Sequence, residues 1–259
     1  MLNFSILSSG SCGNSYIFYD GNDSIMVDMG ISTKSAEERI LLSSIPLDSI
    51  RAIFITHLHP DHAGDSLKTF SNKYNLKVFF SKFAAKREHR SFIRLSLDNK
   101  LVNLFTIGET KKIGNFRITS LEAFHDSEGC VSYYITNDEN KICLITDTGY
   151  FSSEMIDAAN DSNILFLESN YDDEMLDNGD YPAWLKNRVR SEKGHLSNEQ
   201  ACRFLKKLNQ NLKKEVYLIH LSANNNTKEI AEKRTKECDL SFKSIIALER
   251  GQFFNKVYD

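Results

Sequence analysis

Three of the seven histidines fall within one short segment, Thr56-His57-Leu58-His59-Pro60-Asp61-His62. The apolar run Ala52-Ile53-Phe54-Ile55 directly before it predicts a strand, so four potential ligands stand together at a strand end. Imidazoles and a carboxylate placed there without compensation carry a high desolvation cost. Neutral imidazole and carboxylate are also the preferred ligands of zinc and similar divalent ions. The segment therefore predicts a metal site and disfavours its alternative, a solvated histidine-rich turn.

Strand-like and helix-like segments follow one another with no low-complexity stretch or linker between them, so we expect one domain over residues 1–259. Apolar runs predict strands at Asn3–Leu7, Ser15–Tyr19, Ser24–Asp28, Arg51–Thr56, Lys77–Phe80, Phe116–Ala123, Val131–Thr136, Lys141–Thr146, Ile164–Glu168, Glu215–His220 and Ser244–Leu248. Helical patterns occur at about Thr33–Ser43, Ala63–Tyr74, Ser197–Leu208 and Thr227–Cys238. Two α/β halves around mixed strands predict sheets packed face to face with helices outside.

Composition limits the classes of partner. With 32 Lys and Arg against 35 Asp and Glu, the formal net charge is −3, so any nucleic-acid surface must be a local patch. Apolar runs stay far shorter than the roughly 20 residues of a membrane span. The five cysteines are scattered and never spaced CxxC, which indicates a reducing compartment. Since the N-terminus shows no secretion signal, we expect a cytoplasmic protein without a membrane partner.

The pattern His57-x-His59-x-Asp61-His62 resembles the signature motif of the metallo-β-lactamase-fold hydrolases. Four more segments resemble the other motifs of that family, in the same order along the chain: Met26-Val27-Asp28-Met29-Gly30, Ala123-Phe124-His125-Asp126, Ile145-Thr146-Asp147-Thr148-Gly149 and Leu218-Ile219-His220-Leu221-Ser222. The resemblance implies an α/β fold, a four-layer αββα sandwich that holds two metal ions at the sheet edge.

The resemblance also implies how the ligands are divided: His57, His59 and His125 for one ion, Asp61, His62 and His220 for the other, and Asp147 between the two. Asp28 is expected to orient the His57 loop, and a helix cap is its alternative role. Two ions about 3.5–4 Å apart can bridge a hydroxide and lower its pKa towards neutrality, which makes Asp61 part of a catalytic centre. The donor types suit Zn²⁺, Mn²⁺ and iron alike.

Two segments of the last third indicate which reaction the metals serve. Glu168-Ser169-Asn170-Tyr171 follows an apolar run, and Gly194-His195-Leu196-Ser197-Asn198 opens a predicted helix. The pair resembles the acidic motif and histidine loop of the RNase Z-like phosphodiesterases, in which a carboxylate orients a histidine that protonates the leaving oxygen. This resemblance implies Glu168 as the orienting carboxylate and His195 as the catalytic acid. The alternative is an ordinary helix start capped by Ser197 or Asn198.

A narrower resemblance, to the YycJ-like branch of this fold, covers Leu7–Ser15, Glu168–Asp172, Tyr181–Val189 and Gly194–Asn198. That branch is described as bacterial and cytoplasmic, with exonuclease activity on DNA from the 5′ end. Tyr171 departs from it, because histidine is expected at this position. If this position contacts substrate, that contact differs from the one in the YycJ-like branch, whereas the metal site is expected to be the same.

Substrate contacts are expected from six residues near these motifs: Ser11, Asn14, Asn170, Arg188, Arg190 and Ser197. The Gly10–Asn14 loop either offers backbone N–H groups to a phosphate or forms a tight hairpin turn. Two basic stretches are either phosphate-binding tracks or solvated helix faces: Lys82, Lys86, Arg87, Arg90 and Arg94, and Lys186, Arg188, Arg190 and Lys193. Tyr181 and Trp184 are either base-stacking or core aromatics. Solvated surface is expected for His89, Lys206-Lys207 and Lys213-Lys214.

The leading hypothesis is a dinuclear metal phosphodiesterase that acts on nucleic acid, with DNA favoured over RNA, and in particular a DNA exonuclease. The alternative is a small-molecule hydrolase of a thioester, lactone or cyclic phosphodiester on the same metals. A non-catalytic binder is disfavoured because the expected ligand set is intact.

Overall fold

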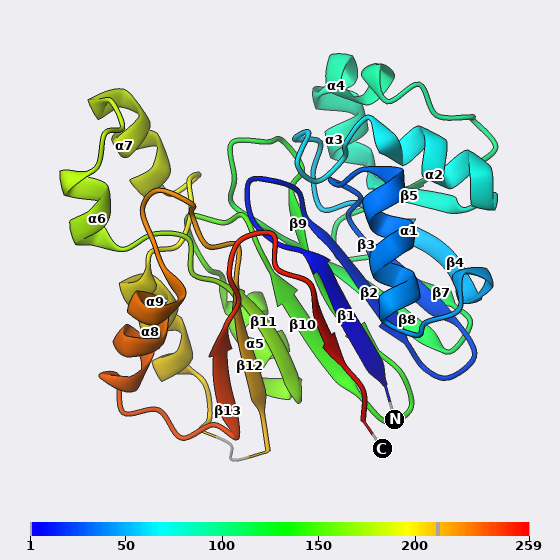
Figure 1. The fold of residues 1–259 in the computed structure, drawn as a ribbon. Helices are drawn as coiled ribbons and strands as arrows, with labels where there is room; N and C mark the ends of the chain where they lie inside the picture. The colour runs from blue at the N-terminus through cyan, green and yellow to red at the C-terminus, as the bar shows by residue number, and fades with distance from the viewer. Residues whose placement is uncertain (1, 211–212, 259) are drawn as a thin grey trace.

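Two mixed β-sheets pack face to face in the computed structural model, which describes residues 2–210 and 213–258 (Figure 1). In spatial order, the first sheet contains β14 (Phe254–Lys256), β1 (Asn3–Ser8), β2 (Ser15–Tyr19), β3 (Ser24–Val27), β4 (Ile50–Phe54), β5 (Lys77–Ser81) and β6 (Val102–Phe105). The second contains β13 (Ser244–Ala247), β12 (Glu215–Ile219), β11 (Ile164–Glu168), β10 (Lys141–Ile145), β9 (Val131–Thr136), β8 (Phe116–Glu122) and β7 (Thr110–Ile113). Neighbours from β3 to β6 and from β10 to β13 pair in parallel, and the remaining neighbours pair antiparallel.

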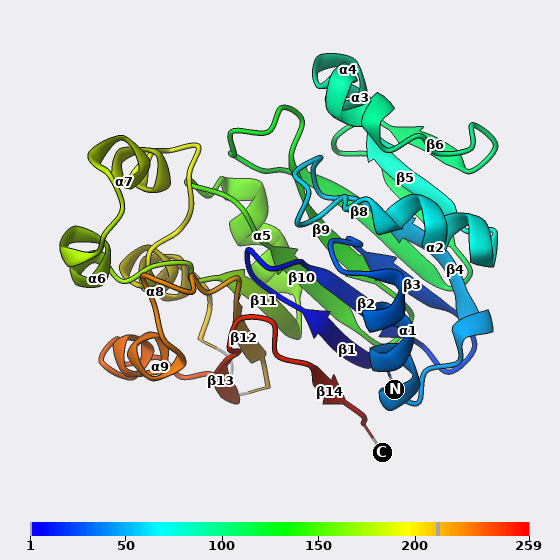
Figure 2. The same cartoon turned by 45° about the horizontal axis from the view of Figure 1, so that its top comes forward.

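Helices cover the outer face of each sheet. The first sheet is flanked by α1 (Thr33–Leu42), the 3-10 turn η1 (Leu47–Ser49), α2 (Ser66–Tyr74), α3 (Lys82–Arg87) and α4 (His89–Arg94). The second is flanked by α5 (Ser153–Asp161), α8 (Asn198–Lys207) and α9 (Lys228–Lys236), with α6 (Asp173–Asn178) and α7 (Ala183–Arg190) beyond its edge (Figure 2). The expected αββα sandwich is confirmed.

Strand side chains alternate between two apolar layers. In β2, Tyr16 and Phe18 enter the core between the sheets, whereas Ile17 enters the core beneath α1 and α2. In β4, Phe54 joins the central core and Ile53 joins the outer one. Because both faces of these strands are covered, they read in the sequence as continuous apolar runs rather than as alternating ones.

Several element boundaries differ from the sequence-based expectation. Asp28 and His220, expected as the last residues of strands, lie just beyond β3 and β12 with φ of 61° and 57°, and Asp147 follows β10 with φ of 50°. Left-handed backbone costs a residue other than glycine about 1–3 kcal/mol, and it turns each side chain sharply at the strand end. The helix expected from Ala63 begins at Ser66, because Ala63 pairs with Met29 in a β-bridge.

The prediction that Lys214 is a solvent-exposed charge is wrong. Its side chain is fully buried, and its ammonium donates to the carbonyls of Ala159 and Ser162 at the C-terminal end of α5. Burial lowers the pKa of Lys214 to about 8. A cation at this end of a helix satisfies carbonyls that have no partner within the helix.

None of the helices within residues 2–210 and 213–258 has the length and apolar character needed to cross a membrane.

Candidate metal centre

The predicted site residues gather at one edge of the sandwich, where parallel strands of both sheets end. Asp28, the His57–His62 segment, Asp147 and His220 follow β3, β4, β10 and β12, respectively, and Glu168 ends β11. His125 enters from the connection between β8 and β9. The carboxyl ends of parallel strands are where α/β proteins build sites, because turns there bring distant segments together.

Gly30 allows the His57–His62 segment to lie against the first motif. A Cβ atom at Gly30 would come within 1.8 Å of the Asp61 carbonyl oxygen, so only glycine fits. The Met29 amide donates to the His62 carbonyl at 2.8 Å, and the Asn14 amide donates to the Asp61 carbonyl at 2.7 Å. The glycine after the first-motif aspartate thus places Asp61 and His62 beside that aspartate.

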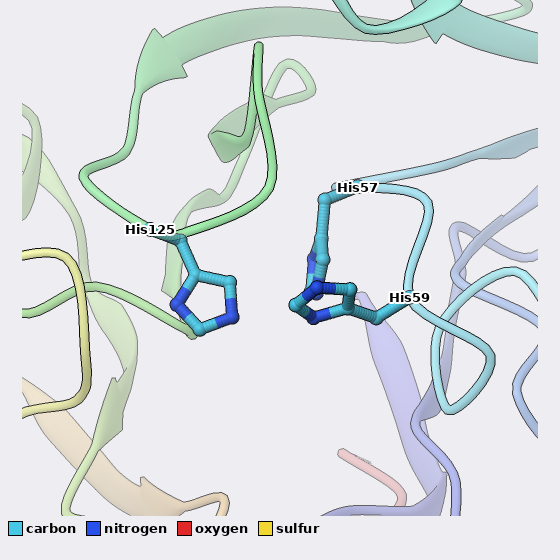
Figure 3. A group of neighbouring side chains, drawn as sticks. All are labelled: His57, His59 and His125. Atoms are coloured by element: carbon cyan, nitrogen blue, oxygen red, sulfur yellow. The ribbon is translucent and has the colours of Figure 1, made fainter. Parts of the chain in front are cut away.

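All seven expected ligands come together. His57, His59 and His125 direct their rings at one point (Figure 3), with one nitrogen of each within 4.8 Å of the others. Asp61, His62 and His220 form a second group by the same criterion. Asp147 lies between them, its Oδ2 3.1 Å from His62 Nε2 and its Oδ1 3.5 Å from His220 Nε2 and 3.9 Å from His125 Nε2.

Four histidines share one arrangement, in which Nδ1 is held by a protein group: His57 by Thr56 Oγ1 (3.1 Å), His62 by Asp28 Oδ2 (2.7 Å), His125 by the Gly194 carbonyl (3.0 Å) and His220 by Glu168 Oε1 (3.2 Å). A partner on Nδ1 holds the plane of the ring and makes Nε2 the nitrogen that can bind a metal. At His62, Nε2 also lies 2.9 Å from Asn14 Nδ2.

The donor set fits divalent cations. Among the described residues, the buried Nε2 atoms of His57 and His220 have no hydrogen-bond partner. A buried polar atom without a partner is costly, and a cation would satisfy both. Burial also lowers the pKa of His57 well below its usual value and that of His125 to about 4, which keeps both rings in the neutral form that metals require. These residues can therefore hold metal.

Asp28 holds two parts of the centre. Its Oδ1 accepts the Thr56 amide at 2.8 Å, and its Oδ2 accepts the Thr56 hydroxyl at 2.8 Å and His62 Nδ1 at 2.7 Å. Burial raises the pKa of the Asp28 carboxyl, and His62 opposes that rise. The alternative role as a helix cap is wrong, because Ser32 caps α1.

We expect Asp28→Asn to weaken metal binding about 10–100-fold, because the amide cannot hold both His62 and Thr56 as the carboxylate does. Titration of the metal-free protein against a chromophoric chelator measures this change. Asp48→Asn, at an exposed carboxylate of η1, is the matched control. Equal affinities in the two variants would contradict the orienting role.

Glu168 and His195 are in direct contact beside the ligands. His195 Nδ1 lies 2.7 Å from Glu168 Oε1, while Glu168 Oε2 accepts the amides of Thr148 at 3.0 Å and Leu196 at 3.2 Å. Burial lowers the pKa of His195, but the charge and hydrogen bond of Glu168 together with the charge of Asp147 outweigh this effect, and the net pKa is raised. Ser197 caps α8 in a capping box, as its alternative role predicts.

A cavity of about 310 Å³ opens over the ligands, and half of the predicted substrate contacts line it. Ser11, Asn170 and Arg188 face this cavity together with Tyr181 and His195. The other three side chains do not line it: Asn14 contacts the carbonyls of Gly10 and Asp61 and lies 2.9 Å from His62 Nε2, Arg190 pairs with Asp177, and Ser197 caps the first turn of α8. The Gly10–Asn14 loop forms a hairpin turn between β1 and β2, one of its two predicted alternatives, with the Gly13 amide donating to the Gly10 carbonyl.

Asp126 was missed by the sequence analysis. Its Oδ1 lies 3.3 Å from His125 Nε2 and 3.7 Å from His59 Nε2, and its Oδ2 accepts Arg188 Nε. Its place directly after His125, an expected metal ligand, could have indicated that Asp126 lies at the site. Tyr171, which departs from the YycJ-like pattern, is buried against Leu176 rather than lining the cavity.

Comparisons with known proteins agree with this geometry. Residues 24–221 match the model of the β-lactamase superfamily domain. The exodeoxyribonuclease YycJ of Bacillus anthracis is 34% identical over 232 residues, which cover 89% of this chain and 86% of YycJ. The chain belongs to the β-lactamase superfamily, in the family of YycJ. The exodeoxyribonuclease WalJ of Streptococcus pneumoniae serotype 2 (strain D39), another relative in this superfamily, is 32% identical over 228 residues, covering 88% of this chain and 84% of WalJ.

Two solved structures share the fold of this chain. The metallo-β-lactamase fold protein YhfI of Bacillus subtilis superposes with a TM-score of 0.72 at 17% identity, covering 98% of this chain and 99% of YhfI. The short form of human tRNase Z gives a TM-score of 0.62 at 14% identity, covering 97% and 98% of the two chains. The family resemblance drawn from the five motifs is confirmed.

Proposed function

We propose that this superfamily member is a metal-dependent phosphodiesterase that digests nucleic acid from an end, with DNA as its substrate and the 5′ end as its start. The contact between His195 and Glu168 beside the metal ligands carries the proposal. A phosphodiester expels a poor alkoxide leaving group, so a positioned proton donor is worth about 10²–10⁴-fold in rate. The names of YycJ and WalJ, exodeoxyribonucleases, support DNA as the substrate.

Each residue has a defined role in this proposal. Two divalent ions, Zn²⁺ or Mn²⁺, would be held by the seven ligands and supply a water that ionises near neutral pH and positive charge at the phosphoryl oxygens. Glu168 holds His195 through Nδ1, which leaves His195 Nε2 to give its proton to the leaving oxygen. Arg188, at the cavity wall, contacts a non-bridging phosphate oxygen.

End-labelled DNA duplexes incubated with Mn²⁺ or Zn²⁺ test the proposal, with Asp61→Ala as the control. We expect metal-dependent shortening from the 5′ end, which the control lacks. Label placed at the 3′ end should persist on progressively shorter strands. A protein that carries two metals and leaves both duplex and single strands intact would overturn the proposal.

A further inference from the structure

A second cavity, which we call the α3 pocket, adjoins the metal centre. Its volume is about 420 Å³, and its walls come from α3, the loop after β6, the β8–β9 connection and the loop after α7. His125 lines both this pocket and the cavity over the ligands. The two spaces therefore meet at an expected metal ligand.

Apolar and aromatic side chains form much of the α3 pocket. Phe83, Ile107 and Phe124 all line it. Phe83 keeps 43% of its surface exposed, with the Arg87 guanidinium 5.3 Å from its ring centroid. The Phe124 ring meets Tyr150 edge to face, with 5.2 Å between the centroids. Exposed rings in a concave site are typical of ligand-binding surfaces, and their flat faces suit stacking on a base.

Three lysines from the two predicted basic stretches meet at this pocket. Lys82 and Lys86 come from α3, and Lys193 comes from the segment between α7 and His195. Lys82 Nζ donates to Thr106 Oγ1 at 3.4 Å, whereas Lys86 and Lys193 form no ion pair with any residue in the described ranges. The lysines outnumber the two carboxylates of the lining, Glu122 and Glu128. The pocket therefore favours a ligand that carries negative charge.

We propose that the α3 pocket binds the nucleotide next to the scissile phosphate, with its base against Phe83 and Phe124 and its phosphates near Lys82, Lys86 and Lys193. This inference rests on the proposed function, because it takes a nucleic-acid strand as the ligand. A volume of about 420 Å³ lies within the roughly 300–1,000 Å³ of pockets that hold small ligands. A nucleic-acid strand whose phosphate lies at the metal ligands reaches the α3 pocket directly, since His125 borders both spaces.

Figure 2 shows the helices on either side of this edge. The helix α3 lies on one side of the loops at the carboxyl ends of the strands, and α7, which carries Arg188, lies on the other side. Cationic side chains thus flank the metal centre from both sides. Aromatic rings combined with a basic track are the general means of holding a single strand without sequence preference.

The binding test uses the metal-loaded protein and a six-nucleotide DNA strand with phosphorothioate linkages, labelled with fluorescein and followed by anisotropy at several salt concentrations. We expect Phe83→Ala to raise Kd about tenfold with an unchanged salt dependence. Lys86→Ala should raise Kd and also reduce the slope of log K against log salt by about 0.7, as loss of one phosphate contact to a single strand does. Leu41→Ala and Lys206→Ala, at exposed positions of α1 and α8, are the matched controls.

A second measurement uses methyl p-nitrophenyl phosphate, which carries neither a nucleobase to stack on Phe83 nor a second phosphate for the lysines. Its turnover should be unchanged in Phe83→Ala and Lys86→Ala. Binding by these variants that equals the controls, or an equal loss of small-diester turnover, would overturn the inference. A wild type that binds the hexamer through the pocket but does not cleave ordinary DNA would overturn only the proposed function.

Discussion

Replacing His195 by alanine is expected to lower the rate of DNA cleavage about 10²–10⁴-fold while the metal content stays near that of the wild type. The side chain contacts Glu168 through Nδ1 and lines the cavity over the ligands, but it is not among the seven expected metal ligands. Its removal should therefore cost the proton donor and leave the metals in place. Steady-state cleavage of a labelled duplex, together with metal analysis of the same preparation, measures both quantities.

The leaving group separates a proton donor from a structural role. A p-nitrophenyl ester of thymidine phosphate expels an anion that needs no proton, so His195→Ala should cleave it at a rate close to that of the wild type. His89→Ala, at an exposed histidine of α4, is the control. Equal losses on DNA and on the p-nitrophenyl ester would contradict the assignment of His195 as the acid.

The second large effect concerns Asp147. We expect Asp147→Asn to weaken metal binding by more than the roughly 10–100-fold typical of a partner outside the ligand set, and to lower DNA cleavage to background. Burial raises the pKa of Asp147, but His220 and His62 hold it well below its usual value, so the carboxylate is charged. The variant removes that charge at the point between the two ligand groups.

Metal content after gel filtration and cleavage at saturating Mn²⁺ measure the effect of Asp147→Asn. Asp161→Asn, at a carboxylate of α5 remote from the centre, is the control, and circular dichroism verifies that both variants fold. Two tightly bound ions and retained cleavage in Asp147→Asn would rule out a bridging role.

The sequence by itself determined the type of fold and which side chains gather at the candidate metal centre. The resemblance of five motifs to those of the metallo-β-lactamase-fold hydrolases implied all seven expected ligands, and the structure brings them together at the edge where the carboxyl ends of the parallel strands meet. Continuous apolar runs identified most strands, since both faces of the central strands are buried. Short peripheral elements such as β7 and β14 were not predicted, because their side chains are at most partly buried and therefore give no apolar run. The partner of β14, β1, also lies at the other end of the chain.

Only the tertiary structure decided which polar side chains face the substrate cavity. Arg190 and Ser197 lie near the motifs in sequence, yet their hydrogen-bond partners hold them away from the cavity. Asn14 contacts the ring of His62 instead of lining the cavity. In the same way, Lys214 is predicted from the sequence as a surface charge, but in the fold its ammonium donates to carbonyls at the end of α5. The α3 pocket likewise exists only because packing brings Lys86 to Lys193 across more than a hundred residues of chain. The sequence shows which residues are neighbours along the chain and which share one face of a helix or strand. The contacts described above join groups from distant segments, which become adjacent only after the sheets pack.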